Sequence, residues 1–318
     1  MTTIRVGISD QDGLTPPDPL LRRELLGRIA AAGLDHVTVG DHISFHGGTG
    51  FDGMITASML LASHDRLPVL IGVYLLGLRH PMLAARQLAT LAQLAPGRLT
   101  LGVGAAGEDR REVSNAGVDP ATRGRRLDEA LLLLRRLLAG EEVSHQGEFF
   151  RLDQARILPA PQPPVPVVMG GRGEPAIRRT ATLGDGWLGM FCSARRFAET
   201  REAILEAAAQ AGREPPSWFG VNVWCGLDAD PSRARELVAV KMERLYHLPY
   251  EKFQYLAPAG TPRQVAEFLQ PFAAAGAEHL TLVPAGSSIE AEIDAVAEVR
   301  EHLVPGRRGG DHGPVRCP

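Results

Sequence analysis

The segment over residues 95–129 holds the densest group of residues that could do chemistry in this chain. A buried strand is expected over 99–103, and it leads into Gly104 and Gly107. Glycines leave backbone N–H groups accessible, because no Cβ blocks the approach of a ligand. Glu108 follows at once, so a titratable carboxyl stands beside that accessible backbone. The residues alone fit a ligand-binding loop or a tight turn with a solvated acid, and both interpretations stay open.

Two further predicted strands also carry residues that could take part in chemistry or ligand binding. Asp41 and His42 come directly after a strand expected over 36–40, and Gly72 lies within a strand expected over 69–75. In a parallel barrel the residues that follow each strand share one rim, which is where active sites are built. Asp41 could instead cap a turn, His42 could be structural, and Gly72 could allow a bulge without a function. Because the predicted fold places these residues on one rim, a functional site is the better interpretation.

The segment MGGRGEPAIRR (169–179) predicts an anion site. Gly170 and Gly171 stand directly before a helix N-terminus, where free N–H donors and the positive end of the helix dipole point at the same place. This arrangement suits a phosphate, although the ending of a Walker A loop is absent. Three cations are expected nearby, namely Arg172, Arg178 and Arg179.

Other kinds of site lack their sequence patterns. His42 and His46 have a spacing that serves a metal only on a helix, and SFHGGTG around them predicts a loop. No HExxH pair and no GxSxG elbow is present, so neither a metal site nor a serine hydrolase is expected. The letters GVGAAG (102–107) match GxGxxG, but the next strand lies too far off to supply the acid of a dinucleotide site.

Composition narrows the class of protein. The chain has 318 residues, 44% apolar residues and a formal net charge of −3, which supports a large core and argues against nucleic-acid or membrane-surface binding. Its three cysteines are scattered, as in a reduced protein. No signal-peptide core and no apolar run long enough to span a bilayer is visible, so a cytoplasmic location is expected.

Strand and helix patterns alternate along the whole chain, which is typical of parallel strands joined by right-handed crossovers. We predict an α/β fold, a (β/α)8 TIM barrel with insertions that forms one domain over 1–304. An open doubly wound sheet is the alternative. The expected strands cover 4–8, 36–40, 69–75, 99–104, 165–170, 186–191, 219–226 and 279–284.

Local signals add detail to this organisation. Asp18-Pro19 predicts the start of the first helix, and Asp119-Pro120 that of a later one with leucines on one face. Residues 141–164 predict a small hairpin inserted into the barrel. Residues 241–258 cluster aromatic side chains, which could cover a pocket or could equally form core or an oligomer contact. The tail over 305–318 is expected to be disordered.

Together the motifs resemble those of the bacterial-luciferase-like superfamily, in particular its branch of oxidoreductases that use the deazaflavin coenzyme F420. The resemblance runs over roughly 4–214 and more loosely to the end. It depends on the order and spacing of several segments, each weak alone: GDH (40–42), RHP (79–81), PGRLTLGVGAAGEDRRE (96–112), GVDPATRGRRLDEALLLLRRL (117–137), GEFFRLDQARILPAPQPPVPVVMGG (147–171) and GDGW (184–187).

The resemblance implies a (β/α)8 barrel, often dimeric, with a coenzyme across its mouth. A non-proline cis peptide would back the ring system and falls at Gly72–Val73 by alignment. The loop after the strand over 99–104 would touch the polar chain and ring edge of the coenzyme through Ala106, Gly107 and Arg111. The segment Met169, Gly170, Gly171, Arg172 and Gly173 would hold its phosphate.

The resemblance also implies catalytic roles. His42 would exchange a proton with the substrate, since histidine titrates near neutral pH, and Asp41 would orient it. Glu108 would serve the ring edge, although one extra residue precedes it in this loop. The chain is thus expected to transfer a hydride between F420 and a small organic substrate, which the sequence does not identify. An FMN-dependent monooxygenase using oxygen is the alternative in the same fold, and a barrel that binds its ligand without turnover is a third.

Overall fold

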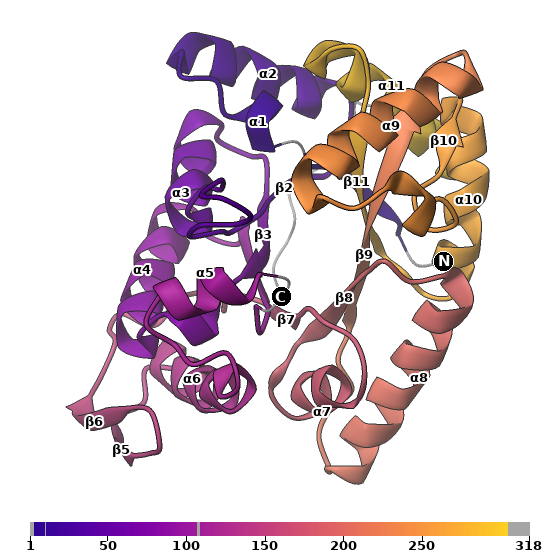
Figure 1. Cartoon of the computed structure of the whole chain (residues 1–318). Helices are drawn as coiled ribbons and strands as arrows, with labels where there is room; N and C mark the ends of the chain where they lie inside the picture. The colour runs from indigo at the N-terminus through magenta and orange to yellow at the C-terminus, as the bar shows by residue number, and fades with distance from the viewer. Residues whose placement is uncertain (1–2, 10, 107–108, 305–318) are drawn as a thin grey trace.

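Eight parallel strands close into a barrel in the computed structural model, which describes residues 3–9, 11–106 and 109–304 (Figure 1). Strand β8 pairs with β9, and β11 pairs with both β9 and β1, so the sheet closes and the predicted barrel is confirmed over the open sheet. A two-residue strand, β10 (Ala259–Gly260), pairs with the end of β9. The barrel strands are β1 (Arg5–Ile8), β2 (His36–Val39), β3 (Val69–Tyr74), β4 (Leu99–Val103), β7 (Val167–Met169), β8 (Gly186–Met190), β9 (Trp218–Leu227) and β11 (His279–Ala285).

Helices surround the strands on the outside of the barrel (Figure 1). The longer ones connect successive strands, as parallel pairing requires. The helices are α1 (Gln11–Leu14), α2 (Pro19–Ala31), α3 (Gly53–Ser63), α4 (Pro81–Leu94), α5 (Arg110–Asn115), α6 (Arg123–Leu138), α7 (Glu174–Leu183), α8 (Ala194–Gln210), α9 (Pro231–Tyr246), α10 (Pro262–Ala274) and α11 (Ile289–Leu303), with short 3-10 helices η1 (Leu76–Leu78) and η2 (Tyr250–Lys252).

The two predicted helix starts have different outcomes. Asp18 caps α2 as expected, because its carboxylate accepts the N–H of Leu20 at 2.8 Å. Asp119 does not begin α6. Its carboxylate accepts the N–H of Ala121 at 2.9 Å and forms a turn, and the helix starts later, at Arg123. In both a turn and a helix cap, the aspartate carboxylate accepts the N–H of the residue two positions on. The Asp-Pro pattern alone therefore does not distinguish a turn from a helix start.

The interior of the barrel is filled below its carboxyl end. Several polar and aromatic side chains lie between the strands. Nε2 of His36 is 2.9 Å from the Thr281 hydroxyl oxygen, and the ring of His279 stacks on Trp218 with centroids 4.2 Å apart. Burial lowers the pKa of His36 to about 4, so this ring stays neutral at physiological pH. A Cβ on Gly7 would lie 2.4 Å from Nε2 of His36, so only glycine leaves room for it.

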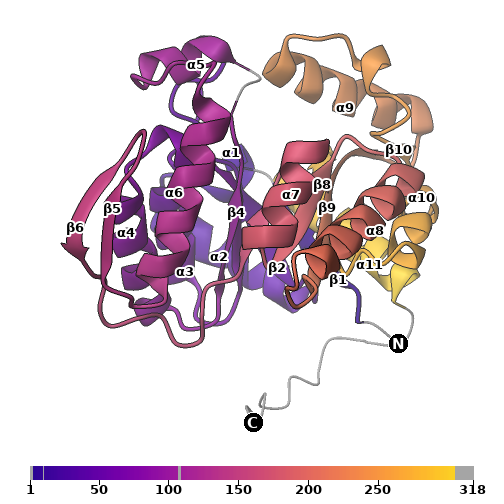
Figure 2. The same ribbon diagram turned by 90° about the horizontal axis from the view of Figure 1, so that it is seen from below.

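The two predicted irregular regions differ in structure. Within 141–164, β5 (Val143–Gln146) and β6 (Arg151–Ala155) form an antiparallel hairpin outside α4 and α6 (Figure 2). Glu129 of α6 holds this hairpin, since it accepts the N–H groups of Phe149 and Phe150 at 3.0 and 2.9 Å. Residues 241–258 hold no hairpin and form the end of α9 and η2. The predicted disordered tail, 305–318, lies outside the described residues.

The leucine face of α6 provides a test of the core. Leu134 is fully buried in the hydrophobic core, whereas 42% of Leu132, on the same helix, is exposed. Leu134→Ala is expected to lower the free energy of unfolding by about 2–5 kcal/mol, because it leaves a cavity. The matched control Leu132→Ala should cost well under about 1 kcal/mol. Urea unfolding of both variants checks this, and equal losses would contradict the packing described.

Candidate functional site

A cavity of about 1710 Å³ opens at the carboxyl end of the barrel. Its walls come from the ends of the barrel strands, from the loops that follow them, and from helices α7 and α9. Helices α5 and α9 extend beyond this same end of the barrel, on opposite sides of the opening (Figure 2). The loop after β2 reaches the end of α9, where the rings of His46 and His247 stack with centroids 5.1 Å apart. The residues of the predicted rim therefore line one continuous cavity.

The Asp41 carboxylate bonds to Arg79 and to backbone N–H groups instead of to the His42 ring, so it does not orient the imidazole directly as predicted. The Asp41 side chain is fully buried. The carboxylate accepts two hydrogen bonds from Arg79 at 2.7 and 2.8 Å, and one each from the N–H groups of Gly53 and Leu75. Burial raises the pKa of Asp41, while Arg79 and both backbone N–H groups oppose that rise. With all four bonds used, Asp41 fixes the backbone that carries His42.

Glu112 is the acid that contacts His42. Nδ1 of His42 lies 3.3 Å from both carboxylate oxygens of Glu112, and the Glu112 side chain is only 2% exposed. The N–H groups of Ile43 and Ser44 also donate to Glu112, at 2.7 and 3.1 Å. An ionised carboxylate only accepts, so Nδ1 carries the hydrogen and Nε2 of a neutral ring is left to exchange a proton. The ring of Phe45 stacks on His42 at 4.1 Å.

The end of β3 has the predicted non-proline cis peptide, at Gly72–Val73. The register between β3 and β4 shifts at this point, so the strand bulges. Val73 approaches two neighbouring strands so closely that a Cβ would lie 2.4 Å from it at Gly104 and 2.8 Å from it at Gly170. Gly72, Val73, Gly104 and Gly170 all line the cavity. The bulge and these glycines form the part of the wall made of β3, β4 and β7.

The diglycine segment leads into α7 as predicted. Among the described residues, no acceptor takes the N–H of Gly171, Arg172 or Gly173. Gly171 and Gly173 have φ angles of 100° and 80°, which favour glycine. Trp187 holds the segment from behind, because its Nε1–H donates to the Gly171 carbonyl at 3.0 Å. Gly170, Gly171 and Arg172 line the large cavity, whereas Gly173 and Arg172 line a smaller one beside it.

Several predicted site residues lie elsewhere. Met169 is 1% exposed and packs in the core between the barrel and the helices, because neighbouring residues of a strand point to opposite faces. Arg111 is exposed on α5 and is not among the cavity residues. The Arg178 and Arg179 side chains bind Asp128, so neither is a free cation, although Arg179 lines the cavity. Ala106 lines the cavity, and Gly107 and Glu108 lie outside the described residues.

Residues 3–9, 11–106 and 109–304 contain no group of three or more histidine, cysteine, aspartate or glutamate side chains placed to hold a metal ion. In the same ranges, every helix is too short or too polar to cross a membrane.

Comparison with known proteins agrees with this architecture. A model of the luciferase-like monooxygenase family matches residues 9–259. The chain belongs to this family. The F420-dependent glucose-6-phosphate dehydrogenase of Beutenbergia cavernae is 33% identical over 248 residues, which cover 75% of this chain and 72% of that protein. The corresponding enzyme of Kribbella flavida is 29% identical over 310 residues, covering 88% of this chain and 92% of that protein.

Two solved structures have a similar fold. An F420-dependent secondary alcohol dehydrogenase, in complex with an F420-acetone adduct, has a TM-score of 0.83 at 20% identity and covers 95% of this chain and 99% of its own. The monooxygenase RslO1 from Streptomyces bottropensis has a TM-score of 0.78 at 22% identity, with the same coverage. At these identities the likeness shows the fold.

In this luciferase-like chain, Glu112 is a site residue that the sequence analysis missed. Asp109 caps α5 by accepting the N–H of Arg111 at 2.9 Å. An aspartate followed three residues later by a glutamate is a signature of a helix start, so the position of α5 could have been found. The contact with His42 could not, because the two residues are 70 positions apart.

The hydrogen bonds that Glu112 accepts predict that the free energy of unfolding depends on pH. Burial alone would raise the pKa of Glu112, but the hydrogen bonds from His42, Ser44 and Ile43 outweigh it and the pKa is lowered. A lowered folded-state pKa gives stability that is present above the ordinary glutamate pKa of about 4.3 and is lost as the pH falls through the folded value. Glu112→Gln should therefore destabilise the protein at pH 7, and less so as the pH falls from about 4.5 toward 3.

Urea unfolding at stepped pH values measures this difference between wild type and Glu112→Gln. The exposed Glu214 provides a control, because Glu214→Gln should change stability little at any pH. A loss in Glu112→Gln that is constant from pH 7 to pH 3 would contradict the role given to the carboxylate.

Proposed function

We propose that this chain is an F420-dependent oxidoreductase that transfers a hydride between the deazaflavin and a small organic substrate. The observation that carries the proposal is that one cavity combines the His42–Glu112 pair with the open N–H groups before α7. An acid–base pair and an anion site in one cavity suit a redox coenzyme with a charged side chain. The F420-dependent relatives, similar over most of their length, support this choice.

The residues present fit such a coenzyme. The N–H groups of Gly171, Arg172 and Gly173 would bind its phosphate at the positive end of α7. Gly104 and Gly170 leave space that a Cβ would fill. Oδ1 of Asn222, a cavity residue only 6% exposed, has no hydrogen-bond partner among the described residues. A buried acceptor without a donor suits the N–H edge of a heterocyclic ring.

The bound coenzyme would supply a ring carbon that gives or accepts a hydride. His42 would hold or take the proton of the reacting oxygen at Nε2, because Nδ1 is committed to Glu112. Glu112 would act as a positioning residue that selects the tautomer of the His42 ring. Phe45 limits rotation of the imidazole by stacking on it. The role that the resemblance gave to Glu108 stays a prediction, as do a homodimer and a cytoplasmic location.

The deciding experiment is a titration of the purified chain with F420 and, separately, with FMN. We expect a fluorescence change that saturates with F420 and a much weaker response to FMN. Tight binding of FMN with none of F420 would replace the proposal by the flavin-dependent monooxygenase alternative.

Removal of the His42 imidazole should separate binding from catalysis. His42→Ala is expected to keep F420 affinity within about threefold and to lower kcat by about 10²–10⁴-fold, the usual contribution of a positioned acid–base group. His302→Ala, on α11 outside the cavity, is the matched control and should leave both unchanged. Near-normal turnover in His42→Ala would show that another group moves the proton.

A carboxylate at the diglycine should repel the coenzyme phosphate. Gly171→Glu is expected to weaken F420 affinity about tenfold or more, because two like charges a few ångströms apart repel near a surface. Gly171→Gln is the matched control, since it introduces the same side-chain shape at a φ of 100° without the charge. Fluorescence titration measures both affinities. Equal losses in the two variants would place the phosphate elsewhere.

A further inference from the structure

Four aromatic rings follow one another at the mouth of the cavity. We call them the ring stack and define it as His42, Phe45, His46 and His247. The ring centroids of His42 and Phe45 are 4.1 Å apart, and so are those of Phe45 and His46. The centroids of His46 and His247 are 5.1 Å apart. The stack therefore connects the proposed acid–base residue, on the loop after β2, with the end of α9.

The middle of the ring stack has little freedom to move. Phe45 is 1% exposed and lies between two histidine rings, so its ring cannot turn without displacing them. The N–H of His46 donates to Oδ2 of Asp109 at 2.9 Å, which ties His46 to the start of α5. His46 has a φ angle of 36°, a left-handed conformation that persists in a residue other than glycine only where its surroundings hold it.

His247 holds the outer end of the ring stack from α9. It caps the C-terminus of this helix with a φ angle of 53°, and its N–H donates to the Glu243 carbonyl at 2.9 Å. Helix α9 in turn packs against β9 through an apolar cluster that includes Trp224, Val238 and Met242. Since α5 and α9 lie on opposite sides of the opening, His46 receives support from both sides (Figure 2).

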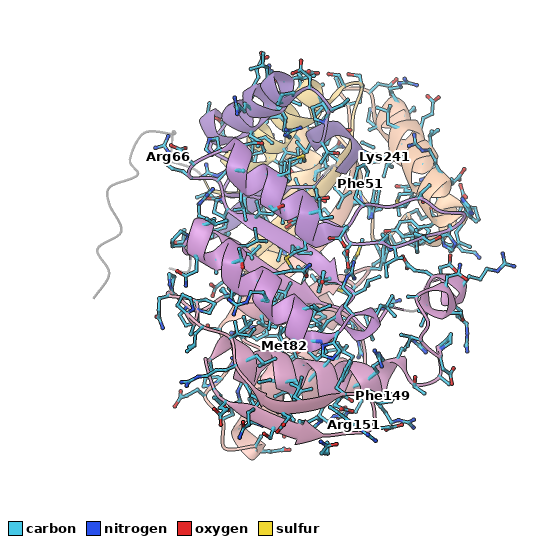
Figure 3. The ribbon with its side chains drawn as sticks, turned by 90° about the vertical axis from the view of Figure 1, so that its left-hand side faces the viewer. Phe51, Arg66, Met82, Phe149, Arg151 and Lys241 are labelled. Atoms are coloured by element: carbon cyan, nitrogen blue, oxygen red, sulfur yellow. The ribbon has the colours of Figure 1, made fainter. Side chains whose placement is uncertain are left out.

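The two outer rings of the stack lie outside the cavity. Figure 3 labels Phe51 of the loop after β2 and Lys241 of α9, which both line the cavity. His46 comes from the same loop and His247 from the end of the same helix, but neither is among the cavity residues. Neither side chain is therefore placed to touch a ligand there, and any effect on the reaction passes through the inner rings.

We propose that His46 and His247 are positioning residues that couple α9 to the orientation of the His42 imidazole. This inference rests on the proposed function, which gives His42 the proton exchange. Glu112 selects the tautomer with the hydrogen on Nδ1 only while the ring faces its carboxylate. The ring stack keeps the imidazole in that orientation, so that Nε2 remains the nitrogen that exchanges a proton.

The tautomer of His42 in the chain without F420 tests this coupling. NMR of the imidazole nitrogens distinguishes the two tautomers at about pH 8, well above the ordinary histidine pKa of about 6.5. The His42 signals are those lost in His42→Ala. His247 is exposed, and asparagine tolerates a left-handed backbone, so His247→Asn should fold. The ratio of the Nδ1–H to the Nε2–H tautomer is expected to fall about two- to tenfold, the factor that loss of one aromatic contact gives.

Three comparisons identify the cause of that fall. His247→Phe retains a ring and should keep the wild-type ratio. The double variant of His46→Asn with His247→Asn should lower the ratio no further than His46→Asn alone, because His247 acts through His46. His302→Asn, on α11, is the matched control and should change nothing. An unchanged ratio in His247→Asn, an equal fall in His247→Phe, or a further fall in the double variant would overturn the inference.

Fluorescence titration of the same variants with F420 separates this inference from the proposed function. His46 and His247 lie outside the cavity, so His46→Asn and His247→Asn should bind F420 with wild-type affinity. The expected tautomer ratios in a chain that does not bind F420 would contradict the coenzyme and keep the coupling. F420 binding with a tautomer ratio that no variant changes would keep the coenzyme and remove the coupling.

Discussion

The buried ion pair of Asp41 with Arg79 organises the end of the barrel where the cavity opens. Its bonds join the loop after β2, the start of α3, the end of β3 and the loop before α4. Arg79 also binds Asp52, which caps α3, and lies 4.4 Å over the Tyr74 ring. A buried charge left without its partner is strongly unfavourable, so this arrangement has few alternatives. His42 follows Asp41 directly and takes its position from it.

Several polar residues of the segments that carry the family resemblance position backbone. Arg79 of RHP binds Asp41, and Asp185 of GDGW binds Arg135 and the N–H of Val167. Glu129 holds the hairpin over α6. These side chains join elements that are far apart in the sequence, which explains why the motif pattern indicates the fold more directly than the chemistry. The acid–base groups of the cavity are a smaller set, centred on His42 and Glu112.

The barrel could be predicted from sequence because its signals are local. Short apolar runs end in glycine or polar residues, and all eight expected strands are present with ends shifted by no more than two residues. The site could be predicted only in part from the sequence. Which face a strand residue occupies depends on the strand register, which the sequence does not fix. Met169, predicted to line the cavity, therefore lies in the core. The partner of His42 depends on how α5 packs over the loop after β2, and no spacing in the chain encodes that distance.

The indole bond behind the diglycine segment has a stereochemical consequence. In a trans peptide the carbonyl and the following N–H point in opposite directions along one rigid plane. Because Trp187 draws the Gly171 carbonyl to itself, it also turns the N–H of Arg172 away from the indole. Trp187 therefore fixes the direction of a donor in the proposed phosphate site through the orientation of a single amide plane.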